Sequence, residues 1–155
     1  MKRLFRHLLI LLFVLPAAGQ PYVWKNVQIV GGGFVDGIIF HPAAKGVCYA
    51  RTDMGGAYRW DEKSKRWQPI LDWVSYEDNN LMGVESIAVD PSDPDRVYLA
   101  CGTYTNPNVP NGAILRSEDR GKTFARTDMA FKMGGNEDGR GNGERLAVDP
   151  HDGRI

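Results

Sequence analysis

Three segments of this 155-residue chain repeat one pattern, a short apolar run that ends in a polar residue and proline. They are residues 37–42, 85–91 and 144–150. Further apolar runs follow the first two segments, at residues 47–51, 57–60, 97–101 and 113–116. Each run is short, apolar or β-branched, and bounded by Gly, Pro, Asn or Asp, which are strand signals. A unit of roughly 50 residues with several short strands predicts a β-propeller blade, so the expected fold class is all-β.

The repeat also sets the expected blade boundaries. The first blade is predicted over about residues 24–83 and the second over about 84–143, and the third begins with a strand in 144–155. A propeller needs several blades to cover the faces of its sheets. Residues 20–155 are therefore interpreted as the N-terminal part of a first propeller domain, a fragment of about two blades and the start of a third.

The second unit contains Ser117-Glu-Asp-Arg-Gly-Lys-Thr-Phe124, the Ser-x-Asp-x-Gly-x-Thr-aromatic pattern called an Asp-box. Asp119 is expected to accept hydrogen bonds from the turn backbone, Gly121 to permit a positive φ, and Phe124 to fill the blade core. Residues 60–67 form a degenerate version without the glycine. The motif predicts a structural turn between the third and fourth strands of a blade, and a catalytic Asp119 is the weaker interpretation.

The direction of successive strands sorts the connections onto two faces. Neighbouring antiparallel strands reverse direction, so the Pro-containing turns and the Asp-box turn share one face. The other face receives the longer connections, at residues 52–56, 71–83, 102–112 and 127–143. Long loops on a rigid scaffold commonly carry function. These loops contain Asp53, Trp73, Tyr76, Tyr104, Phe131 and Asn136. Aromatic rings and carboxylates together suit a sugar polymer.

The first twenty residues differ from the rest of the chain. Three basic residues precede an unbroken apolar run over residues 8–15, and small residues follow up to Gly19. These are the three parts of a secretory signal peptide, and the run is shorter than the roughly 20 residues that span a bilayer. Residues 1–19 are therefore predicted to be a signal peptide, with the mature protein secreted, extracellular or periplasmic, and off the membrane. A membrane anchor is the alternative.

The net charge, together with the few histidine and cysteine residues, argues against nucleic-acid, metal and cofactor binding. Lys plus Arg and Asp plus Glu are both 19, and zero net charge argues against nucleic acid. His7, His41 and His151 are scattered without metal-ligand spacing, so no metal and no cofactor are expected. Cys48 and Cys101 each lie in an apolar run, which favours two separate buried thiols, although an oxidising compartment would permit a disulfide.

Four stretches of the chain resemble glycoside hydrolase family 74, the xyloglucan-active β-1,4-glucanases. They are residues 49–60 (Tyr-Ala-Arg-Thr-Asp-Met-Gly-Gly-Ala-Tyr-Arg-Trp), 82–91, 117–124 and 142–150. The first and last are specific, whereas the Asp-box is shared with sialidases and many non-enzymatic propellers. The resemblance runs from about Trp24 to the end. It implies two seven-bladed propellers facing each other across a cleft, with the second propeller of the same full-length chain as partner.

The resemblance implies an inverting mechanism with two aspartates, in which Asp53 is the general base and the acid lies outside this chain. An inverting base activates water on the far side of the sugar from the acid. An Asp with an ordinary pKa of about 3.9 is ionised at neutral pH. Arg51 or Arg59, if either reaches Asp53, would favour its charged form. Gly55 and Gly56 are interpreted as leaving room for a polymer chain. The alternative role for Asp53 is a turn cap.

Tyr104 and Asn136 are the candidate substrate-binding residues, with loop structure as the equal alternative. Glu144 and Arg145 are expected to form a structural ion pair. The predicted function is a secreted glycosidase that cleaves the β-1,4-glucan backbone of xyloglucan, with this fragment alone inactive. A sialidase-like hydrolase and a non-catalytic propeller that binds protein or glycan are the alternatives. Cleavage within the polymer or at its ends stays open.

Overall fold

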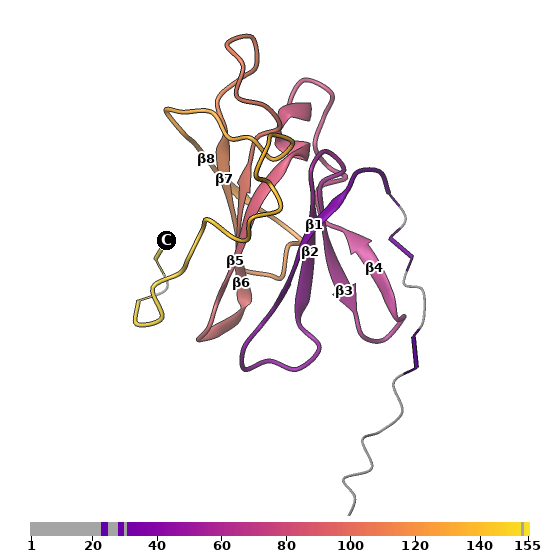
Figure 1. Cartoon of the computed structure of the whole chain (residues 1–155). Helices are drawn as coiled ribbons and strands as arrows, with labels where there is room; N and C mark the ends of the chain where they lie inside the picture. Colours follow the sequence, from indigo (N-terminus) through magenta and orange to yellow (C-terminus); the bar gives the residue numbers. More distant parts are fainter. Residues whose placement is uncertain (1–22, 25–27, 30, 153) are drawn as a thin grey trace, which may run out of the picture.

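The computed structural model describes residues 23–24, 28–29, 31–152 and 154–155, so the predicted signal peptide lies outside the described residues. Two four-stranded antiparallel sheets form the molecule (Figure 1). The first contains β1 (Val35–Phe40), β2 (Cys48–Thr52), β3 (Ala57–Asp61) and β4 (Arg66–Pro69). The second contains β5 (Val84–Asp90), β6 (Asp93–Cys101), β7 (Ala113–Ser117) and β8 (Ala125–Asp128). A 3₁₀ helix, η1 (Asn79–Met82), precedes β5, and the described residues include no α-helix.

Strand order within each sheet follows the order in the sequence, and every neighbouring pair is antiparallel. This meander is the arrangement expected for a propeller blade, and it confirms the all-β fold class. The connections also fall on the predicted ends. Figure 1 shows the long connections 70–83 and 102–112 at the upper end of the sheets and the β1–β2 turn at the lower end.

The third repeat does not form the predicted strand. In the described part of the chain, residues 144–150 carry no strand assignment. The backbone amides of Arg145 and Leu146 instead donate to the Ser86 hydroxyl, at 2.8 and 3.0 Å. A strand is defined by a backbone ladder with a partner, and these amides use a side chain. Leu146 and Val148 still pack against the second sheet, beside Tyr98 and Ile114.

One apolar core joins the two sheets. Its residues come from β2, β3, β5, β6 and β7 and include Tyr49, Val84, Leu99 and Leu115, all fully buried. Burial of one such leucine side chain stabilises the fold by about 2 kcal/mol. His41 adds a hydrogen bond between the two sheets, because its Nε2 donates to the Asp90 carbonyl at 2.9 Å. The sheets therefore form a rigid base for the connections above them.

Residues 117–124 form the turn from β7 to β8, where Asp119 makes the hydrogen bonds predicted for it. Its carboxylate accepts from the amides of Lys122 and Thr123, both at 2.9 Å, and from the Thr123 hydroxyl at 2.6 Å. Gly121 has a φ of 79°, and Phe124 packs against the core between the sheets. These bonds lower the pKa of Asp119, the one from the Thr123 hydroxyl most.

Both cysteines are buried free thiols, as predicted. Cys101 lies in the core between the sheets, whereas Cys48 belongs to a separate cluster with Ala50, Tyr58 and Trp67. Burial raises the pKa of both thiols. No helix among the described residues has the length and apolar character needed to cross a bilayer.

Candidate active site

Asp53 follows β2 immediately, at the end of the sheets that carries the long loops. Only 6% of the residue is exposed, and the Phe34 amide donates to Oδ1 at 2.8 Å. The Asp53 amide in turn donates to the Phe34 carbonyl at 3.1 Å. This reciprocal pair fixes both the backbone and one carboxylate oxygen of Asp53, which is the positioning that a catalytic carboxylate requires.

The glycines around Asp53 allow two backbones to touch. A Cβ on Gly55 would lie 1.7 Å from the Gly32 carbonyl oxygen, and one on Gly33 would lie 2.8 Å from Oδ1 of Asp53. Gly33 and Gly56 also have positive φ values, 95° and 81°. The interpretation that Gly55 leaves room for a polymer chain is therefore wrong, because segment 31–34 already fills the space against it. The glycines are needed for close packing inside the site.

Neither of the two arginines proposed from the sequence pairs with Asp53. Arg51 directs its Nε to Glu144 at 2.7 Å, and Arg59 donates to the Arg120 carbonyl at 2.9 Å. The cation beside Asp53 is Arg140, whose Nε lies 3.7 Å from Oδ2. Arg140 comes from the long connection after β8, so no local sequence signal indicated this contact.

The same arginine also lies against a second buried carboxylate, Asp36. Arg140 Nε is 3.7 Å from Asp36 Oδ1, and Arg51 Nη1 is 3.9 Å from Asp36 Oδ2. The Asp36 side chain is 0% exposed, and neither of its oxygens has a hydrogen-bond partner. Burial raises the pKa of Asp36 and outweighs the opposing effect of Arg51. Sequence reasoning missed this residue.

A sequence signal for Asp36 did exist in the repeat. When the prolines of the three segments are superimposed, Asp36, Glu85 and Glu144 occupy the same position. Each acid lies beside an arginine, Glu85 beside Arg145 and Glu144 beside Arg51. The predicted ion pair between Glu144 and Arg145 is therefore wrong, because their side chains belong to two different pairs.

Tyr104 and Asn136 lie in contact, although they come from different connections. Asn136 Nδ2 donates to the Tyr104 hydroxyl at 2.8 Å, and the Asn136 amide donates to the Thr103 carbonyl at 2.9 Å. Tyr104 also lines a groove of about 420 Å³. The other lining residues are Met54, Asn79, Asn80, Met82, Thr103, Val109 and Pro110. Because Met54 follows Asp53 in the chain, the groove lies next to the Asp53 loop.

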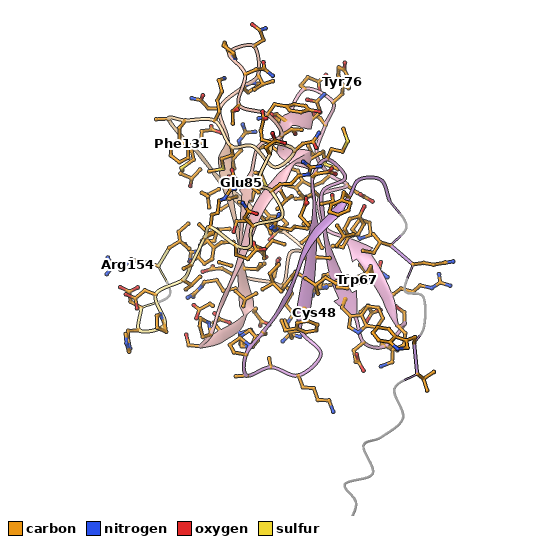
Figure 2. The ribbon with its side chains drawn as sticks, in the orientation of Figure 1. Cys48, Trp67, Tyr76, Glu85, Phe131 and Arg154 are labelled. Carbon is orange, nitrogen blue, oxygen red and sulfur yellow. The ribbon has the colours of Figure 1, made fainter. Side chains whose placement is uncertain are left out.

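The three further aromatic residues, Trp73, Tyr76 and Phe131, are all exposed. Figure 2 shows Tyr76 and Phe131 at the upper end of the sheets, and 84% and 58% of their surfaces are accessible. Trp73, 52% exposed, differs in its position, because its ring packs on Phe124 with a centroid distance of 6.2 Å. That contact draws Trp73 toward the 117–124 turn and away from the face on which it was predicted.

Within the described residues, no group of three or more His, Cys, Asp or Glu side chains is arranged to hold a metal ion. The chemistry that the arrangement offers is carboxylate chemistry. It has one carboxylate fixed at the loop-rich end of the sheets, Asp53, and a buried carboxylate behind it, Asp36. Arg140 lies between the two.

Comparison with known proteins identifies the family. No family model matches the chain. A xyloglucanase from Paenibacillus sp is 57% identical over 141 residues, 90% of this chain and 14% of that protein. A xyloglucanase from Acetivibrio thermocellus is 57% identical over 137 residues, 87% of this chain and 16% of that protein. The crystal structure of a GH74 xyloglucanase from Xanthomonas campestris matches with a TM-score of 0.78 and 59% identity.

That match covers 86% of this chain and 19% of the Xanthomonas protein, so the chain spans less than a fifth of the length of these relatives. The solved GH74 structures are β-propellers, which confirms the predicted propeller class. Sequence identity to these relatives is above 50% over most of the chain, and the fold is shared with a solved member of the family. The chain belongs to glycoside hydrolase family 74.

Proposed function

We propose that this chain supplies the general-base side of the active site of a secreted, inverting xyloglucan hydrolase. The observation that carries the proposal is the fixed carboxylate of Asp53 at the loop-rich end of the sheets. Family membership supports it, because the relatives are named xyloglucanases. The general acid is then supplied from outside these 155 residues, across the cleft between two propellers.

In this mechanism Asp53 removes a proton from a water molecule. Oδ1 is held by the Phe34 amide, which leaves Oδ2 to accept that proton. The water oxygen forms a bond to the anomeric carbon as the glycosidic C–O bond breaks, and the departing oxygen takes a proton from the acid. An inverting pair needs about 6.5–9.5 Å between its carboxyl groups, which leaves room for the water. The β-linkage therefore yields an α-configured product.

The groove beside Asp53 is the proposed substrate-binding surface. It is lined by Tyr104, and the hydrogen bond from Asn136 orients the Tyr104 hydroxyl. A half-buried phenol held in this way presents both an aromatic surface and a polar group to a sugar. Tyr104 and Asn136 are accordingly proposed to bind the glucan backbone. The exposed rings of Tyr76 and Phe131 extend the aromatic surface at the same end.

Secretion is proposed from residues 1–19, whose basic, apolar and small-residue parts follow the order of a signal peptide. A polysaccharide is too large to enter a cell intact, so an enzyme that cleaves it has to act outside the cytoplasm. Mass spectrometry of the protein recovered from culture medium tests this, and a mature N-terminus near residue 20 is expected.

The catalytic proposal is tested with Asp53→Asn in the full-length protein, incubated with xyloglucan. Asparagine keeps the acceptor for the Phe34 amide but removes the base, so kcat should fall by about 10²–10⁴-fold. Asp95→Asn is the matched control, because Asp95 pairs with Arg120 at the opposite end of the sheets. Activity of Asp53→Asn within a few-fold of the control would contradict the assignment.

A further inference from the structure

Asp36 is the buried carboxylate behind Asp53. In the pairing of β1 with β2, Val35 lies opposite Thr52 and Gly37 opposite Arg51, so Asp36 is the extra residue of a β-bulge. A bulge redirects the side chain of its extra residue, and bulges occur often beside active sites. Here the redirected carboxylate is fully buried, and neither oxygen has a hydrogen bond. Such burial is costly unless the group has a function or carries a proton.

Arg140 links this carboxylate to the catalytic one. Its Nε lies 3.7 Å from Asp36 and 3.7 Å from Asp53, and it makes no hydrogen bond to either. Two separations of 3.7 Å put the nearest carboxylate oxygens within 7.4 Å of each other. At that distance the charge on one carboxylate acts strongly on the other in a buried setting. Arg140 is therefore shared between two competing anions.

The cluster holds more negative than positive charge. The groups that face Asp36 are Arg51 on β2, Asp53 after β2, and Arg140 and Glu144 after β8. Glu144 is well satisfied, because it accepts from Arg51 and from the Ile87 amide at 2.6 Å. With two guanidinium groups against three carboxylates, one negative charge is left over.

Asp36 is the carboxylate in this cluster whose charge no hydrogen bond stabilises. It has no hydrogen bond, whereas Asp53 and Glu144 each have at least one. Burial raises the pKa of Asp36, which means that it gains a proton as the pH falls while an exposed Asp would still be ionised. When it does, its attraction for Arg140 disappears.

We propose that Asp36 is a positioning residue that controls the strength of Asp53 as a base through Arg140. Ionised Asp36 holds Arg140 midway between the two carboxylates and adds negative potential at Asp53, which makes proton removal from water easier. Protonated Asp36 releases Arg140 to Asp53, where the guanidinium stabilises the carboxylate and weakens it as a base. This inference rests on the proposed function of Asp53.

The test compares the pH dependence of kcat for the full-length wild type and Asp36→Asn on xyloglucan. Asparagine keeps the shape of Asp36 but removes its charge, so the variant imitates the protonated state at every pH. The ratio of wild-type kcat to Asp36→Asn kcat should be about threefold to tenfold at high pH, and it should approach one as the pH falls through the titration of Asp36. KM should not change, and Asp36→Glu should retain part of the kcat that Asp36→Asn loses.

A purely structural role for Asp36 predicts a different curve, a loss of kcat by the same factor at every pH. That result, or no loss at any pH, would overturn the inference. Asp95→Asn controls for the loss of one carboxylate elsewhere. Activity of Asp53→Asn within a few-fold of the Asp95→Asn control would instead remove the proposed function, whereas a strongly impaired Asp53→Asn with a flat Asp36→Asn ratio would remove only the inference.

Arg140→Gln provides a second measurement, in a double-mutant cycle with Asp36→Asn. It leaves both carboxylates in place but removes the group through which they compete. In the Arg140→Gln background, the change from Asp36 to Asn should have less than half its effect in the wild type, as a double-mutant cycle measures. Full additivity of the two changes would contradict coupling through Arg140.

Discussion

Gly55→Ala is the substitution that tests most sharply how the fold positions Asp53. The added Cβ would lie 1.7 Å from the Gly32 carbonyl oxygen, whereas carbon–oxygen contacts of this kind normally stay above roughly 3.2 Å. One of the two backbones has to move by more than 1 Å. The loop resists that movement, because the Gly55 amide donates to Thr52 Oγ1 and the Tyr58 hydroxyl donates to the Gly55 carbonyl.

The strain is therefore transferred to the carboxylate of Asp53. The Phe34 amide that holds Asp53 is in the same segment as Gly32, so separating the two backbones breaks or lengthens this hydrogen bond. A displacement of about 1 Å at a reacting group costs roughly 10²-fold in rate. We expect kcat of the full-length Gly55→Ala variant on xyloglucan to fall about 10²-fold, with a smaller change in KM.

Gly32→Ala is the matched control, because it adds the same methyl group on the other side of the same contact. A Cβ at Gly32 meets no atom within 4 Å, so its kcat should stay within about threefold of the wild type. Thermal unfolding of both variants separates loss of fold from displacement of Asp53. Equal kcat values for Gly55→Ala and Gly32→Ala would refute the argument from close packing.

Two further substitutions test the supporting structure. Asp119→Ala removes four hydrogen bonds in the 117–124 turn and should destabilise the full-length protein by about 1–3 kcal/mol at pH 7. Because the pKa of Asp119 is lowered in the fold, its contribution is full above about pH 4 and is lost as the pH falls further, so the difference in Tm should shrink between pH 6 and pH 3. Arg51→Met leaves Glu144 and Asp36 without their buried cation and should cost about 3–5 kcal/mol, measured by denaturant unfolding; a change below 1 kcal/mol would contradict the structural role of Arg51.

The sequence was sufficient to predict the sheets, because each blade is encoded locally. Short apolar runs and turn residues recur with a period of about 50, and strand parity then assigns each connection to one end of the sheets. Asp53 was placed correctly at the loop-rich end for this reason. The turn at Asp119 was also predictable, because its hydrogen bonds join residues within four positions of each other.

Contacts between distant parts of the chain were not predictable in this way. Arg140 meets Asp53 and Asp36 only because the connection after β8 folds back over the first sheet. The role of Gly55 was misjudged for the same reason, since its partner is the backbone of segment 31–34. The strand expected at residues 144–150 is absent from the described chain, where the amides of Arg145 and Leu146 donate instead to the Ser86 hydroxyl.

Chemical rescue of Asp53→Ala in the full-length protein tests the central claim most directly. Azide is a nucleophile that needs no base, so it can replace both Asp53 and the water that Asp53 activates. The account predicts that added azide restores cleavage of the β-1,4-glucan and yields a glycosyl azide of α configuration, identified by proton NMR. A β-configured product, or an Asp53→Ala variant that hydrolyses xyloglucan at the wild-type rate without azide, would contradict Asp53 as the base of an inverting enzyme.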